Sequence, residues 1–113
     1  MIVGGTVMLL RRAFSYVGSA IFGYGATGNA NNQSITNKVS DTGVVATDTA
    51  GVGTARQALA AAGYGTDKAI FGYGYATSNV SMTNKVSNTG VVAADVTGVG
   101  TARDALAAAS FGV

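Results

Sequence analysis

The sequence predicts an all-β protein built from four-stranded antiparallel units. Three observations predict this fold class: an internal repeat, an alternation of side chains with period two within it, and glycine-containing turn sequences between the β-rich runs. The chain has 113 residues, of which 48% are hydrophobic and 11% are charged. Because the apolar content is ordinary for a soluble protein, we expect one small folded domain rather than a disordered segment.

The two copies of the internal repeat are nearly identical. The run AIFGYG at 20–25 returns at 69–74, and TNKVS at 36–40 returns at 83–87. From the second run onward the copies align at an offset of 47 residues, with a gap of two residues before it. With that gap, 31 of the 44 residues from 69 to 112 match their partners. Identity this high indicates a recent duplication or a deliberate design.

Each element of the second copy has its own signal, and strands are predicted near 56–64, 69–74, 80–86 and 91–96. The third run alternates Met82, Asn84 and Val86 with Ser81, Thr83 and Lys85, which is typical of a strand with one packed face. It is followed by Ser-Asn-Thr-Gly at 87–90, where an Asx side chain and a glycine able to adopt positive φ predict a hairpin turn.

The first predicted strand has a helical alternative. Thr54 can serve as an N-cap, the residues 55–62 are good helix formers, and Gly63 stands where a C′ glycine belongs. A helix of about eight residues is marginal without tertiary support. We therefore expect a strand in this segment, with a short helix as the alternative.

The repeat divides the chain into four segments. Residues 1–19 are an N-terminal segment and a candidate for a diverged first strand; 20–55 are repeat 1, with strands two to four of a unit; 56–102 are repeat 2, a complete unit; and 103–113 are the first strand of a further unit. Repeat units generally need at least about three neighbours to bury their faces. We therefore predict a homo-oligomer with strand complementation between chains, either a ring of about three or four chains or an open fibre.

The order of these motifs resembles a kelch-type β-propeller repeat. In that family an arginine precedes the first strand, a short hairpin follows, and glycines close the second strand. Arg56, the hairpin residues Asp67 and Lys68, and the closing glycines Gly72 and Gly74 hold the matching places. The resemblance covers all but the first 19 residues and implies kelch-like blades of about 47 residues, about two per chain. The composition is also similar to that of Gly-, Thr- and Ala-rich tail and fibre proteins of phages.

The residue inventory argues against several classes of function. The chain has no cysteine, histidine or glutamate, so we expect no catalytic nucleophile–base pair, no enzyme activity, and neither a metal nor a cofactor. A net charge of +2 is too small for a nucleic-acid interface. We expect neither a signal peptide nor a membrane span, since Arg11 and Arg12 follow the apolar start and no long uninterrupted apolar run exists.

Five residues are candidates for ligand binding. Tyr24, Tyr73 and Tyr75 can form an aromatic platform for sugars, with the loop asparagines Asn32 and Asn79 beside them. Packing in the core or between blades is the preferred role of the tyrosines, and sugar binding is the alternative.

Other repeated polar residues favour structural roles. Arg56 and Arg103 are expected to be hydrogen-bonding struts between blades, with an anion site as the alternative. Gly-Val-Gly-Thr at 51–54 and 98–101 lacks the lysine and spacing of a P-loop and is interpreted as a turn between blades. Two pairs could supply calcium ligands but are more simply solvated turn residues: Asp41 with Asp48, and Asn88 with Asp95.

The sequence as a whole predicts a non-enzymatic structural or assembly protein whose tandem repeats build a ring or a fibre. A virion, phage-fibre or extracellular subunit and an engineered propeller fragment all fit, and an extracellular or virion-associated location is favoured. The alternative is a multivalent, lectin-like glycan-binding propeller. The loops 26–33 and 75–80 differ between the copies, whereas a multivalent lectin should keep its binding loops alike, so the structural function is preferred.

Overall fold

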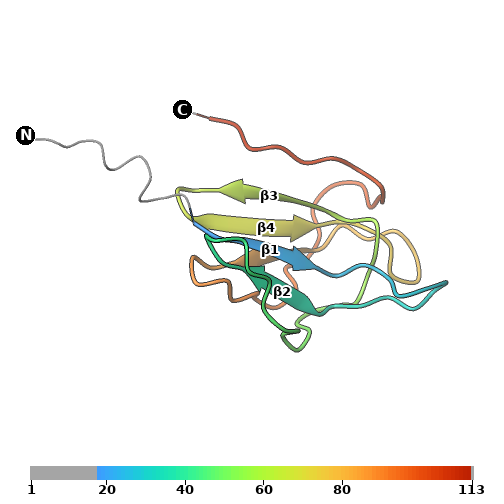
Figure 1. Cartoon of the computed structure of the whole chain (residues 1–113). Coiled ribbons are helices and arrows are strands. Elements are labelled where there is room, and N and C mark those ends of the chain that lie inside the picture. The colour runs from blue at the N-terminus through green and yellow to red at the C-terminus, as the bar shows by residue number, and fades with distance from the viewer. Residues whose placement is uncertain (1–17, 113) are drawn as a thin grey trace, which may run out of the picture.

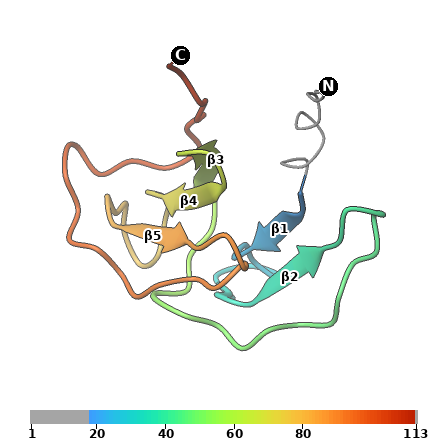
Figure 2. The ribbon, with the colours of Figure 1, turned by 90° about the vertical axis from the view of Figure 1, so that its left-hand side faces the viewer.

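The structure, a computed structural model, describes residues 18–112 and confirms the all-β prediction, with five strands and no helix in that range. The strands are β1 (Ala20–Gly23), β2 (Thr36–Val39), β3 (Ala60–Tyr64), β4 (Lys68–Gly72) and β5 (Thr83–Val86), of which Figure 1 labels the first four. They form two antiparallel sheets: β1 and β2 in repeat 1, and a three-stranded sheet with the order β3-β4-β5 in repeat 2 (Figure 2). The segment after Thr54, for which a short helix was the alternative, therefore contains a strand, β3. No helix among the described residues is long and apolar enough to cross a membrane.

The two repeats have the same strand register. Phe22 of β1 pairs with Asn37 of β2, and their counterparts Phe71 and Asn84 pair between β4 and β5. β3 adds a third strand to the second sheet, with Ala60 opposite Gly72 at one end and Tyr64 opposite Lys68 at the other. The identical registers follow from the identical sequences of the strands.

The strands are shorter than predicted. The first strand of repeat 2 begins at Ala60 instead of residue 56, because Ala58 has a φ of 55° and interrupts the extended backbone. The run 91–96 forms isolated bridges to β5, Val86 with Val92 and Thr83 with Val96, and no continuous strand. Repeat 1 has the equivalent bridges, Val39 with Val45 and Thr36 with Thr49.

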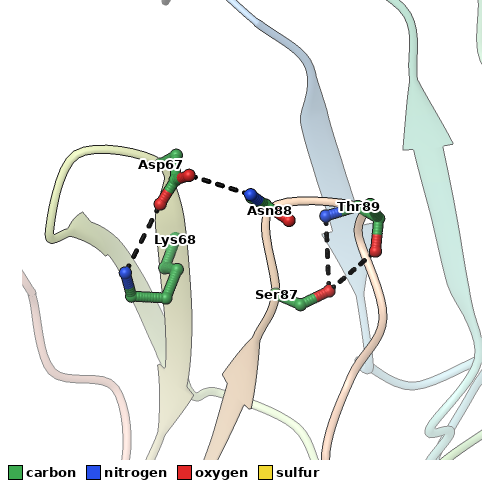
Figure 3. Close-up of polar contacts among 5 residues, drawn as sticks. All are labelled: Asp67, Lys68, Ser87, Asn88 and Thr89. Atoms are coloured by element: carbon green, nitrogen blue, oxygen red, sulfur yellow. Dashed lines mark hydrogen bonds and ion pairs between the residues drawn. The ribbon is translucent and has the colours of Figure 1, made fainter.

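The predicted hairpin turns are present in both repeats, and a serine caps each of them. Gly43 and Gly90 have φ of 84° and 80°, as the turn requires. Ser87 Oγ accepts hydrogen bonds from the amides of Thr89 and Val91, and Ser40 does the same in repeat 1. Asn88 was expected to supply the Asx contact, but its Nδ2 instead donates to Asp67 at 2.9 Å, across to the β3–β4 turn (Figure 3).

The core lies where the two repeats meet. Figure 2 shows the two sheets side by side, joined by the long connection between β2 and β3. The ring centroids of Tyr24, which follows β1, and Phe71 of β4 are 5.1 Å apart. The buried apolar side chains are Tyr24, Phe71, Val86 and Val92, with Ile21, Val52, Leu59 and Ala69 packed against them. Because this cluster draws on both repeats, each repeat depends on the other for its core.

The residues after repeat 2 follow β3 without pairing as a strand. Ala105 donates its amide hydrogen to the Ala58 carbonyl at 2.7 Å, and Ser110 Oγ donates to the Gly63 carbonyl at 2.6 Å. The segment 103–113, expected to be the first strand of a further unit, contains no strand in its described residues, 103–112. The candidate diverged first strand within 1–19 falls almost wholly outside the described residues.

Candidate functional site: a buried arginine between the sheets

Arg56 is the centre of the junction between the two sheets, and its side chain is completely buried. Its Nε donates to the Tyr73 carbonyl at 2.8 Å, its Nη1 to the Thr54 carbonyl at 3.0 Å, and its Nη2 to Asn84 Oδ1 at 2.6 Å. The guanidinium also lies 4.7 Å from the ring centroid of Tyr24, in cation–π geometry. Arg56 is thus a hydrogen-bonding strut at this junction, and its expected place between propeller blades stays a prediction.

Asn84 links this cation to a carboxylate. Asn84 is itself completely buried, and its Nδ2 donates to Asp95 Oδ1 at 2.8 Å and to the Ala93 carbonyl at 3.1 Å. The Oδ1 of this amide therefore accepts from Arg56 while its Nδ2 donates to Asp95. An amide side chain carries an acceptor oxygen and a two-hydrogen donor nitrogen, so it can bridge the cation and the carboxylate without a charge of its own.

Asp95 closes the network onto Thr54. Its carboxylate accepts hydrogen bonds from the Thr54 amide at 3.2 Å and from Thr54 Oγ1 at 2.7 Å. Partial burial raises the pKa of Asp95, but the hydrogen bonds from Asn84 and Thr54 and the charge of Arg56 outweigh it, so that the pKa lies below its ordinary value. The carboxylate is thus held ionised close to the buried guanidinium.

Gly53 makes this close approach possible. It has a φ of 80°, and a Cβ at this position would collide with the carboxylate of Asp95 and the amide of Asn84. The Gly-Val-Gly-Thr sequence at 51–54 therefore lies in the connection between the two sheets, and a turn between blades stays a prediction. The amide and hydroxyl of Thr54, which a phosphate would need, are bound to Asp95.

Two of the candidate tyrosines take part in such arginine contacts. Tyr24 is buried, its hydroxyl donates to the Val52 carbonyl at 2.9 Å, and burial raises its pKa against the opposing charge of Arg56. Tyr73 repeats this arrangement with its hydroxyl on the Val99 carbonyl at 2.8 Å and with Arg103 4.6 Å from its ring centroid.

Arg103 has only part of the environment of Arg56. Its Nη1 donates to the Thr101 carbonyl at 3.1 Å, just as Arg56 binds Thr54. Within residues 18–112, however, its Nε and Nη2 make no hydrogen bond, and the side chain is exposed. Within that range Arg103 therefore makes the threonine-carbonyl and tyrosine-ring contacts of Arg56 but not the hydrogen bonds from Nε and Nη2.

Repeat 1 carries the complementary half. Asn37 Nδ2 donates to Asp48 Oδ1 at 2.8 Å and to the Ala46 carbonyl at 3.2 Å, matching the contacts of Asn84. No arginine of the described part of the chain donates to Asn37, and Asp48 is exposed. The Asn–Asp pair is thus oriented as in the complete junction, but without its cation.

The other three candidate residues are neighbours on the loops. Asn32 Nδ2 donates to the carbonyls of Tyr75 and Ala76, and Tyr75 forms bridges with Gln57 and Asn79. The Tyr75 side chain is 38% exposed, and Asn32 Oδ1 is buried without a partner in the described part of the chain. The structure therefore brings Asn32, Tyr75 and Asn79 together, whereas Tyr24 and Tyr73 lie against arginines. Glycan binding stays a prediction.

The pairs considered for calcium are engaged elsewhere. Asp48 and Asp95 bind asparagine side chains, and Asn88 binds Asp67. No cluster of three or more metal-ligating side chains occurs in residues 18–112. A hollow of about 440 Å³ lies between the β3–β4 hairpin and residues 109–111, away from the junction.

Sequence reasoning identified the arginine but missed its partners. Asn84 and Asp95 belong to motifs that both repeats contain: Thr-Asn-Lys-Val-Ser, and an aspartate eight residues after its serine. The repetition of that aspartate in a chain with only five acidic residues was the available signal. No protein-family model and no curated protein matches this chain. The functional inference therefore rests on the geometry of the junction.

Proposed function

We propose that this chain is a non-enzymatic structural protein whose kelch-like β-repeats assemble into a ring or a fibre, with an extracellular or virion-associated location. The observation that carries the proposal is the unequal burial of equivalent side chains. Phe71 and Val92 are 4% and 8% exposed at the junction, whereas their counterparts Phe22 and Val45 are 64% and 54% exposed. Residues that form a core in one repeat thus lie open on the other.

In this proposal repeat 2 is a four-stranded propeller blade, and repeat 1 supplies strands two to four of another blade. The bridges of Val92 and Val96 to β5, and of Val45 and Thr49 to β2, support a fourth strand in each repeat. Propellers close with about four to eight blades, so two blades per chain fit a ring of about three or four chains. If the rotation between successive chains does not close a ring, the same contacts produce an open fibre.

Electron microscopy and light scattering of the purified chain test this proposal. We expect rings or filaments, and a scattering mass that is a multiple of the single-chain mass at micromolar concentration. A folded monomer at that concentration would overturn the proposal. Far-UV circular dichroism on the same sample establishes that the chain is folded.

A second candidate function, multivalent glycan binding, is favoured by the Tyr75 ring, which is 38% exposed on a loop that Asn32 holds through hydrogen bonds to the Tyr75 and Ala76 carbonyls. The face of a sugar could stack on this exposed ring. A glycan array with the unmodified chain and with the variants Tyr75→Ala and Asn32→Ala tests this function. Binding that both substitutions abolish would replace the assembly proposal, whereas no binding leaves assembly as the function.

A further inference from the structure

We propose that Arg103 of one copy binds the Asn37–Asp48 pair of a second copy, in a head-to-tail interface that reproduces the Arg56 junction between chains. The proposal rests on the assembly function and specifies its interface. It commits to a second copy of this chain as the partner, because the two half-junctions carry the same residue types that meet within the chain.

The arginine half of the interface is already positioned. Arg103 is oriented by the Tyr73 ring and the Thr101 carbonyl, as Arg56 is by Tyr24 and Thr54. The two donors without partners in the described residues are Nε and Nη2, and their equivalents on Arg56 bind a tyrosine carbonyl and an asparagine Oδ1. In a second copy the corresponding acceptors are the Tyr24 carbonyl and Asn37 Oδ1.

The acidic half matches it in charge and in hydrogen bonding. Asp48 is oriented by Asn37 as Asp95 is by Asn84. In the internal junction the aspartate accepts from the amide and hydroxyl of Thr54, so the second copy's Asp48 would accept from those of Thr101. The interface thus places a cation and an anion on opposite partners, which favours one orientation.

Apolar side chains on the two faces also match. In the internal junction Phe71 packs on Gly23, where a Cβ would lie 2.8 Å from the phenyl Cζ. The equivalent glycine, Gly72, leaves the same space open, and a Cβ there would meet only the methyl group of Thr83 within the described chain. Phe22 of the second copy would fill that space.

The backbone after Arg103 completes the second copy's sheet. β3 pairs with β4 in a register that places Ala60 opposite Gly72 and Tyr64 opposite Lys68. The same register pairs residues 107–111 of one copy with residues 19–23 of the next. Among the described residues β1 pairs only with β2, and Phe111 is fully exposed. The contact is heterologous, so it propagates into a ring or a filament.

Blocked variants test the interface. Arg103→Ala removes one face and leaves the other intact, and Asp48→Ala does the converse; both residues are exposed, so each variant should fold. We expect each variant alone to need at least about a thirtyfold higher concentration to assemble. Mixed in equal amounts, they should form a dimer that grows no further, since each dimer then carries two inactive ends.

Engineered cysteines locate the contact, because the chain has no cysteine of its own. Thr101→Cys and Asp48→Cys variants, refolded together and oxidised, should form a disulfide-linked dimer, and neither variant alone should do so. The double variant Thr54→Cys with Asp95→Cys is the matched control, since its disulfide should form within one chain. If the unmodified chain assembles but these substitutions change nothing and no crosslink forms, this interface is wrong and the assembly function stands. A monomeric unmodified chain would overturn both.

Discussion

Arg56 donates a 2.6 Å hydrogen bond to Asn84, and both side chains are completely buried although they lie 28 residues apart in the sequence. A buried charge is costly unless its hydrogen bonds are satisfied and a counter-charge is near. Here three oxygens, the Tyr24 ring and the carboxylate of Asp95 meet those conditions. The hydrogen bonds of the network hold Asn84 of β5 and Tyr73 after β4 to the connection that enters at Thr54. The guanidinium also packs on Tyr24, which follows β1, so the network fixes the connection and the end of β1 against the second sheet.

Arg56→Ala should destabilise the chain far more than Arg103→Ala. The first substitution leaves Asn84 Oδ1 and the Tyr73 carbonyl without a donor in a buried site, so we expect a loss of about 2–5 kcal/mol in the free energy of unfolding. The second removes an exposed contact with Tyr73 and should cost less than about 1 kcal/mol. Urea unfolding at low protein concentration measures both, and equal losses would contradict the central role of Arg56.

Phe71→Ala and Phe22→Ala form a second matched pair. Truncating the buried Phe71 removes the contact with Tyr24 and opens a cavity, for which we expect a loss of about 3–5 kcal/mol. Phe22 is its exposed counterpart, and its truncation should change the unfolding free energy of the dilute chain by less than about 0.5 kcal/mol. Thermal and urea unfolding measure both losses in the free energy of unfolding. Equal losses in the two variants would show that the repeats do not pack on each other.

Asp95 should make the free energy of unfolding depend on pH in the acid range. Because its pKa is lowered in the folded chain from an ordinary value of 3.8, the stabilisation is present above that value and is lost as the pH falls through the lower folded pKa. We expect the urea midpoint to decline below about pH 4. Asp95→Asn should flatten that decline, with Asp67→Asn as the comparison because its pKa is also lowered. An unchanged pH profile in Asp95→Asn would contradict the network.

Asn88 should control the ionisation of Asp67. The hydrogen bond from Asn88 is the main cause of the lowered pKa of Asp67, and Lys68 adds to it (Figure 3). Asn88→Ala should therefore move the pKa of Asp67 up toward its ordinary value, whereas Lys68→Met should move it less. A carboxyl-carbon NMR titration measures both shifts, and a larger effect of Lys68→Met would show that the ion pair dominates.

Local sequence determined the elements and the turns of this protein. The repeat, the alternation at 80–86 and the turn glycines at 43 and 90 act over a few residues, and the structure has antiparallel strands and turns at these places. Propensity alone did not decide the segment after Thr54, where alanines favour a helix. Pairing of β3 with β4 decided it, because a strand there completes a sheet edge while a short isolated helix gains little.

Only the tertiary structure decided which copy of each repeated residue is buried. Asn37 and Asn84 occupy the same Thr-Asn-Lys-Val-Ser sequence and hold the same aspartate contact, yet Asn84 is completely buried under Arg56 while Asn37 is not. The sequence by itself thus determined the repeat and the residue types of the junction. Whether a side chain is buried or paired with a charge depends on the surface that packs against it. Two identical local sequences cannot specify which of them receives such a surface.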